Sequence, residues 1–354
     1  MAITDQLAQS QSSIKVTQPG EEAVRIYRGN GLDAIHHASI AVVDSAGNLT
    51  HYLGDPEFCV MTRSSIKPFQ LMPFLLSGGA DHFGFTPRQL SIMCGSHNGT
   101  DEHRDVVISN LSLAGNRPEF LQCGCHKPIF MDYTKENPLH GEDKDALRHN
   151  CSGKHSGFLA HAKFLGDDVA EYLNPNSKTQ TMIREQLASY CEVDEGSMPR
   201  GTDGCSAPNY AVPIKNLALG FKKLANGEGS SDKERAVATR IRSAMQEYPH
   251  LVSGERRFDL DLMRAFPGNV VCKVGAESIE GFGLANPSIG ICVKINDGAS
   301  RALWPICVAV LKQLGIIANT TETPSLKRHE RPEVRNYRET LTGHIETTFT
   351  LRRA

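Results

Sequence analysis

The sequence predicts an α/β fold in which an antiparallel sheet is flanked by helices and carries a helical insert. Two groups of segments, within residues 21–53 and 268–297, alternate apolar and polar side chains in the manner of strands. The region between them, residues 86–266, shows mainly helical apolar spacing broken by Gly, Pro and Asn. Strands near both ends with helices between them imply one sheet assembled from distant parts of the chain.

The length fits one large α/β unit with an inserted subdomain or two closely joined domains, and we expect residues 21–354 to form a single catalytic unit. The 354 residues can bury a large core, and no low-complexity linker divides residues 21–354. Residues 1–20 are polar, lack the features of a secretory signal and are expected to form a flexible tail. Charged residues make up 22% of the chain and the net charge is −2, so nothing indicates nucleic-acid binding. Because no apolar stretch could span a bilayer, we expect a cytoplasmic protein whose ten cysteines are reduced.

Individual elements follow from local patterns. Turn sequences between alternating runs predict an antiparallel meander over residues 22–51. A helix is expected over residues 65–76, with Pro68 in its first turn, where a missing N–H is harmless, and Pro73 kinking or shortening it. Further helices are expected at residues 102–114, 155–164, 179–191, 210–225, 232–246 and 302–314. Further strands are expected at residues 270–274, 281–284, 289–295 and 344–351.

Ser64 and Lys67 stand at the entrance of the helix expected over residues 65–76, in a Ser-x-x-Lys pattern. A serine hydroxyl is a poor nucleophile until a base removes its proton. Lysine can be that base when burial or a neighbouring cation keeps its amine neutral. On a helix the two side chains share one face. The spacing alone is a weak signal, because residues 12–15 of the polar tail have the same pattern.

Two further elements follow in order, Ser96-His97-Asn98 and Lys273-Val274-Gly275. Together with Ser-x-x-Lys they reproduce the arrangement of penicillin-binding proteins and serine β-lactamases. Taken singly, Ser96 also fits a turn serine and Lys273 a lysine that protects a strand edge. The combination predicts a serine-nucleophile amidohydrolase.

Cys151 and Cys205 each lie in a Gly-rich loop, where exposed N–H groups would favour a thiolate. Ligand chemistry alone predicts a zinc ion bound by Cys151, His155 and Cys205, with water as the fourth ligand. Two buried cysteines beside tight turns fit this spacing equally well, because it is not a tight Cys-x-x-Cys pattern.

Motifs spread over nearly the whole chain resemble the asparaginase II family, which includes the rhizobial enzymes. The matching segments are Arg63-Ser64-Ser65-Ile66-Lys67-Pro68, Gly95-Ser96-His97-Asn98-Gly99, Cys125-His126-Lys127-Pro128, Asn150-Cys151-Ser152-Gly153-Lys154-His155, Gly201-Thr202-Asp203-Gly204-Cys205 and Lys273-Val274-Gly275-Ala276-Glu277. The resemblance implies a β-lactamase/penicillin-binding-protein-like α/β fold, a homodimer, and hydrolysis of L-asparagine to L-aspartate and ammonia. One departure is Ser278, where the family pattern has glycine.

The resemblance also implies roles for individual residues. Its catalytic set corresponds to the nucleophile Ser64, the base Lys67, and Ser96 with Lys273 for proton transfer. Its zinc ligands correspond to Cys151, Lys154 and Cys205 with water, so the resemblance replaces His155 by Lys154. A lysine can bind a metal only as the free amine, which is why ligand chemistry alone does not select it.

The substrate's α-carboxylate and α-ammonium groups need partners of opposite charge or hydrogen-bonding capacity. Residues available for these contacts are Arg63, Asn98, His155, Asp203 and Glu277. Three alternatives stay open: another serine amidohydrolase or esterase of the same fold, a zinc metallohydrolase whose metal-bound water attacks directly, and a non-catalytic metal-binding protein.

Overall fold

The computed structural model describes residues 19–138 and 144–354. The expected tail, apart from residues 19 and 20, lies outside the described residues, as does the second Ser-x-x-Lys pattern at residues 12–15. Within the described residues, no helix combines the length and apolar character that crossing a membrane requires.

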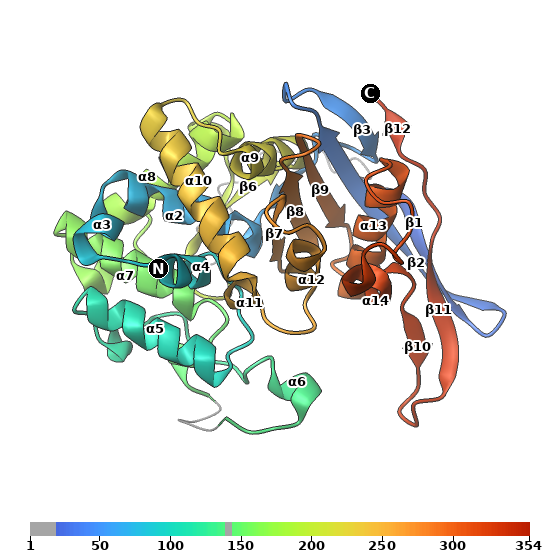
Figure 1. Cartoon of the computed structure of the whole chain (residues 1–354), viewed down its shortest axis with the longest axis horizontal. Helices are drawn as coiled ribbons and strands as arrows, with labels where there is room; N and C mark the ends of the chain where they lie inside the picture. The colour runs from blue at the N-terminus through green and yellow to red at the C-terminus, as the bar shows by residue number, and fades with distance from the viewer. Residues whose placement is uncertain (1–18, 139–143) are drawn as a thin grey trace, which may run out of the picture.

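An antiparallel sheet extends from the middle of the molecule to the right-hand side of Figure 1. Its main path runs β10-β11-β1-β2-β9-β8-β7, and β3 extends it from β2 and pairs with β12. These strands are β1 (Glu21–Arg28), β2 (Gly31–Val43), β3 (Leu49–Leu53), β7 (Val270–Gly275), β8 (Ile279–Leu284), β9 (Ile289–Ile295), β10 (Glu333–Arg335), β11 (Leu341–Thr347) and β12 (Arg352–Arg353). Ile40 of β2 is paired with Val293 of β9, so the sheet joins the two distant groups of strands as predicted.

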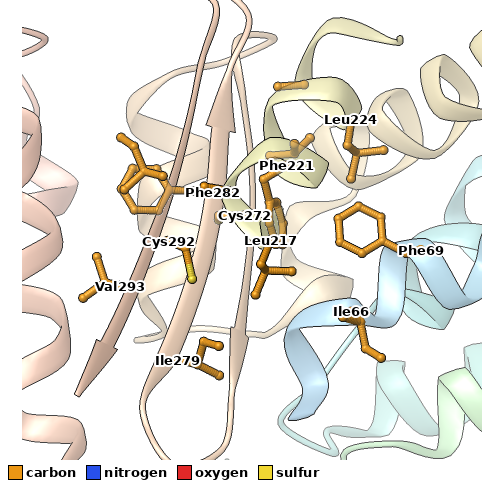
Figure 2. Close-up of a cluster of buried hydrophobic side chains, with 14 of the residues drawn as sticks. Ile66, Phe69, Leu217, Phe221, Leu224, Cys272, Ile279, Phe282, Cys292 and Val293 are labelled. Atoms are coloured by element: carbon orange, nitrogen blue, oxygen red, sulfur yellow. The ribbon is translucent and has the colours of Figure 1, made fainter. Parts of the chain in front are cut away.

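Helices cover both faces of this sheet. Helix α9 (Ile214–Asn226) packs on β2, β8 and β9, and helix α13 (Ser300–Gln313) packs on β9 and β11. Figure 2 shows Leu217 and Phe221 of α9 on one side of the sheet, with Phe282 and Val293 on the other. Gly283 permits the close approach of α9, because a Cβ there would lie 2.1 Å from the carbonyl oxygen of Phe221.

A helical layer lies beyond α9, on the left of Figure 1. Its helices are α2 (Lys67–Leu76), α3 (Gly79–Phe83), α4 (Pro87–Met93), α5 (Asp101–Leu113), α7 (Ser152–Leu165), α8 (Lys178–Cys191) and α10 (Asp232–Glu247). The remaining α-helices of the described residues are α6 (Met131–Thr134), α11 (Pro249–Val252), α12 (Phe258–Ala265) and α14 (Lys327–Glu330). The expected α/β class, with its antiparallel sheet, flanking helices and helical insert, is confirmed.

The largest boundary differences from the predictions concern two elements. The first four residues of the helix expected over 210–225 belong instead to strand β6 (Pro208–Pro213), which pairs with β4 (Cys59–Met61) and β5 (Arg200–Thr202). Helix α9 therefore begins only after Pro213. The strand expected over 344–351 is β11, which begins earlier because its pairing with β10 starts at the hairpin and its pairing with β1 ends at Thr347.

Candidate active site

The candidate nucleophile Ser64 lies in a 3₁₀ turn (Arg63–Ile66) that leads directly into α2. Arg63 has a left-handed backbone, with φ of 50°, which is strained for a residue with a side chain. The Asn209 side chain stabilises this conformation: its Oδ1 accepts from the Arg63 N–H at 2.9 Å and its Nδ2 donates to the Arg63 carbonyl at 3.0 Å. A strand in the helical region thus fixes the backbone next to Ser64.

Lys67 is buried at the start of α2. Its Nζ donates to the Gly95 carbonyl at 2.5 Å, to Ser96 Oγ at 2.9 Å and to the Asn150 carbonyl at 3.4 Å. Burial lowers the pKa of Lys67 to about 8, and the nearby Lys273 and Lys154 cations act in the same direction. A fraction of this amine is therefore neutral near neutral pH. Within the described residues, Lys67 forms hydrogen bonds with Ser96 and with carbonyls, and none with the Ser64 hydroxyl.

Ser64 and Ser96 open onto one pocket of about 360 Å³. Its wall is formed by Asn150, by the turn between β7 and β8, and by Trp304 of α13. In that turn, Glu277 and Ser278 both have left-handed backbones, with φ of 57° and 56°. Glycine adopts this conformation without strain, in keeping with the glycine that the resemblance leads us to expect at the position of Ser278. The Ser278 hydroxyl donates to the Gly298 carbonyl at 2.7 Å.

Lys273 is fully buried on β7 but does not line this pocket. Its Nζ donates to the Val274 carbonyl at 2.6 Å and lies 3.5 Å from Asp259 Oδ2. The structure therefore brings Ser64, Lys67 and Ser96 together, with Lys273 behind the pocket wall.

The residues predicted to contact substrate are spread over several places. Arg63 forms an ion pair with Asp203 at 2.7 Å and a longer one with Glu277 at 3.8 Å. Arg63 and Asp203 line a neighbouring groove of about 670 Å³, whereas Glu277 lines both this groove and the serine pocket. Asn98 is buried, with its Nδ2 donating to Tyr133 Oη at 2.7 Å and to the Glu255 carbonyl at 3.1 Å.

Arg257 is a residue that the sequence reasoning missed. It is half-buried, lines the serine pocket just before α12, and forms no side-chain hydrogen bond or ion pair within residues 19–138 and 144–354. A pocket that holds one cation without a partner and the carboxylate of Glu277 matches a substrate with both charges. The only sequence signal was the charged run Glu255-Arg256-Arg257 ahead of a helix.

A second cluster, next to the first, consists of Cys151, Lys154 and Cys205. Lys154 Nζ lies 2.9 Å from Cys205 Sγ, and both cysteines are buried and unpaired. Hydrogen bonding from the Cys205 thiol and the nearby lysine cations hold the pKa of Cys151 well below its usual range. Burial lowers the pKa of Lys154, but the two cysteine sulfurs outweigh this effect and raise it. Two sulfurs and one amine nitrogen could hold a divalent metal, provided that Lys154 gives up its proton.

His155 is held through one ring nitrogen by a residue outside this cluster. Its Nδ1 forms a hydrogen bond with Tyr172 Oη at 2.7 Å, and its ring lies edge-on to that of Tyr172. Burial lowers the pKa of His155 well below its usual range, so the ring is neutral. Of the two alternative third ligands, Lys154 is the one that contacts Cys205, and His155 does not line the serine pocket.

Asp203 connects the two clusters. Its Oδ1 accepts from Arg63 Nε at 2.7 Å, and its Oδ2 lies 3.8 Å from Cys205 Sγ. A change at the cysteine cluster can therefore reach the nucleophile loop through one side chain.

Comparison with known proteins gave one family and several solved structures. The family model described as L-asparaginase II matches residues 24–347. A candidate β-lactamase from Bacteroides dorei DSM 17855 is 9% identical, with a TM-score of 0.38 over 83% of this chain and 94% of that chain. A class C β-lactamase from Rhodobacter sphaeroides is 12% identical, with a TM-score of 0.37 over 77% and 94%. An octameric penicillin-binding protein homologue from Pyrococcus abyssi is 13% identical, with a TM-score of 0.30 over 86% and 80%. No curated protein sequence matches the chain.

Proposed function

Since the chain belongs to the L-asparaginase II family and is accordingly an amidohydrolase, we propose that it hydrolyses L-asparagine to L-aspartate and ammonia with Ser64 as nucleophile. The observation that supports the serine mechanism is the shared pocket: Ser64 and Ser96 open onto it, and the buried Lys67 amine is hydrogen-bonded to Ser96. A base with a pKa of about 8 is well placed to accept a serine proton near neutral pH.

In the proposed reaction, Ser64 Oγ attacks the carbon of the side-chain amide while its proton passes to the neutral Lys67 amine. The Ser96 hydroxyl is the group through which Lys67 reaches the pocket, because its Oγ lies 2.9 Å from Lys67 Nζ. Backbone N–H groups near Ser64 stabilise the oxyanion of the tetrahedral intermediate.

The intermediate then collapses and the C–N bond breaks. The proton held by Lys67 returns through Ser96 to the leaving nitrogen, which departs as ammonia and leaves a β-aspartyl ester on Ser64. Water attacks this ester with Lys67 again as base, which releases L-aspartate and restores the Ser64 hydroxyl. In this scheme the positive charge of Lys273, which lies behind the pocket wall, repels the Lys67 ammonium and so favours its neutral form.

Substrate recognition is assigned to two charged residues on the pocket wall. Arg257, which has no partner in the described residues, binds the α-carboxylate, and Glu277 binds the α-ammonium. Arg63 and Asp203 pair with one another and hold the nucleophile loop, so their role is to position Ser64.

A zinc ion fits the second cluster by the chemistry of its donors. Cys151, Lys154 and Cys205 would hold it, with water as the fourth ligand. Bound there, zinc would neutralise the two thiolates and link α7 to the loop before β6. The proposed steps use only the side chains of the serine pocket.

A substrate panel tests the activity. The purified protein should release ammonia from L-asparagine, with glutamine measured in parallel because the pocket volume alone does not separate the two. Nitrocefin and a p-nitrophenyl ester test the alternative serine hydrolases. Rapid nitrocefin turnover without ammonia release from either amino acid would contradict the proposal.

A further inference from the structure

A buried group of charged residues lies behind the serine pocket and takes no direct part in the proposed reaction. It consists of Asp259 at the start of α12, Lys273 on β7 and Glu280 on β8. Their side chains are between 0% and 1% exposed, so none is solvated by bulk water. Burying charges without compensation is costly, so the group must be close to electrically neutral.

Asp259 contacts Lys273 in a way that fixes its head group. Asp259 Oδ2 lies 3.5 Å from Lys273 Nζ and accepts from the Val274 N–H at 3.2 Å. Strand β7 ends the main path of the sheet, so this N–H has no strand partner on its outer side. One oxygen of Asp259 therefore accepts a hydrogen bond from the N–H at the edge of β7 and also contacts the Lys273 ammonium.

Glu280 is the member of this buried group whose carboxyl oxygens lack hydrogen-bond partners among the described residues. It lies opposite Val274 in the β7–β8 register, and neither of its oxygens has a hydrogen-bond partner in the described residues. Asp259 Oδ1 is also without one. One oxygen of Glu280, one oxygen of Asp259 and the Cys272 sulfur lie within 4.8 Å of one another. Two buried carboxyl groups this close repel one another when both are ionised, which favours a proton on one of them.

We infer that Asp259 is the positioning residue of Lys273, that it holds this lysine as an ammonium behind the serine pocket, and that Glu280 beside it is a neutral carboxylic acid. One ammonium, one carboxylate and one carboxylic acid give no net charge. The inference rests on the proposed function only where it concerns Lys67, because the Lys273 cation is one of the groups that lower the pKa of Lys67.

The other groups that face Glu280 agree with this assignment. Burial and the Asp259 charge raise the pKa of Glu280 well above its usual range, against the smaller opposing effects of Lys273 and Arg257. The surrounding thiols are neutral, since burial raises the pKa of each; they are Cys272, Cys292 and Cys307. The proton that the carboxyl pair needs thus resides on Glu280, and Asp259 carries the charge that Lys273 requires.

Infrared spectroscopy tests the proton on Glu280 without reference to catalysis. At pH 8 the wild-type protein should show the carbonyl stretching band of a buried carboxylic acid, and this band should be absent in Glu280→Gln. Absence of the band in the wild type, or its survival in Glu280→Gln, would overturn the inference. The infrared result does not depend on Ser64. The assignment of the Glu280 proton can therefore fail while the serine mechanism holds, and the serine mechanism can fail while this assignment holds.

Kinetics test the effect on Lys67. In Asp259→Asn the Lys273 ammonium loses its counter-charge and its proton, so the acidic limb of the kcat/KM profile should move up by about one pH unit. Glu280→Gln replaces a neutral acid by a neutral amide and should leave the limb in place. The substrate's own ammonium titrates identically in every variant. An unmoved limb in Asp259→Asn, or equal shifts in both variants, would overturn the inference.

Two controls keep the test decisive. If Asp259→Asn fails to fold, the double variant Asp259→Asn/Lys273→Met should fold, because it has no uncompensated ammonium; failure of the double variant as well would contradict the positioning role. Zinc content should be equal in wild type, Asp259→Asn and Glu280→Gln. Loss of bound metal in both variants would identify the Asp259, Cys272 and Glu280 cluster as a metal site and overturn the assignment of a proton to Glu280.

Discussion

The side chain of Asn209 forms two hydrogen bonds with the backbone of Arg63, the residue immediately before the candidate nucleophile. Asn209→Asp keeps the acceptor but loses the donor to the Arg63 carbonyl, which frees a strained left-handed residue to relax. We expect kcat/KM to fall by roughly 10–100-fold, because small displacements of a nucleophile are costly.

The matched control is Asn216→Asp. Asn216 also donates to main-chain carbonyls, those of Cys191 and Glu192, but lies on α9 away from the serine pocket. Its kcat/KM should stay near the wild-type value. Equal losses in the two variants would mean that Asn209 acts only through general stability.

The pH dependence of the reaction follows from Lys67. Its pKa is lowered to about 8 in the folded protein, and it acts as a base only when neutral. The value of kcat/KM should therefore rise with pH through about 8 and then level off. Lys67→Arg keeps the charge but cannot supply a neutral amine, and should reduce kcat by roughly 10²–10⁴-fold. The surface variant Lys215→Arg should retain full activity. A kcat/KM profile that is flat between about pH 6 and about pH 9 would exclude Lys67 as the base.

The helix start at Ser64 and Lys67 was predictable because its signal is local. Pro68 and the apolar face that follows it placed a helix start at Ser64 and Lys67, and the structure has that start. The roles of Asn209 and Arg257 depend on contacts between distant segments, which spacing does not contain. Asn209 also stands next to a segment whose pattern indicated a helix, although pairing with β4 and β5 makes it a strand.

Cys151, Lys154 and Cys205 show a different limit of sequence reasoning. Residues three and four positions after Cys151 lie on adjacent parts of the same helix, so spacing alone could not choose between Lys154 and His155. Packing separates them, since Tyr172 binds the His155 ring and Lys154 reaches Cys205. Lys273 was placed correctly on a strand, but its contact with Asp259 could not be inferred from the sequence.

Arg257→Gln should raise the KM for L-asparagine by roughly 10–100-fold, because the α-carboxylate loses a charge-assisted hydrogen bond. The change in kcat should be smaller. The probe is 3-aminopropanamide, which lacks the α-carboxylate; its slower hydrolysis should be the same in wild type and Arg257→Gln. Arg256→Gln is the control, because Arg256 lies over the Tyr133 ring and lines a different groove. An unchanged KM in Arg257→Gln would mean that a residue other than Arg257 binds the α-carboxylate.

Metal analysis of purified variants separates the two candidate zinc ligands. Lys154→Met should lose bound zinc, as should Cys151→Ser and Cys205→Ser. His155→Gln should retain it, since the His155 side chain is bound to Tyr172. Zinc retained in Lys154→Met and lost in His155→Gln would restore the ligand set expected from chemistry alone, and a wild-type protein that binds no zinc would exclude both sets.

Attack by the Ser64 hydroxyl is tested by the ammonia that Ser64→Ala releases from L-asparagine. Ser65→Ala is the matched control, because Ser65 is adjacent and buried but its hydroxyl donates to the Thr62 carbonyl. We predict that Ser64→Ala loses activity by ~10³-fold or more while keeping its metal content, and that Ser65→Ala keeps most of its activity. Full activity in Ser64→Ala, abolished by a chelator, would contradict the account and identify a metal-bound water as the nucleophile.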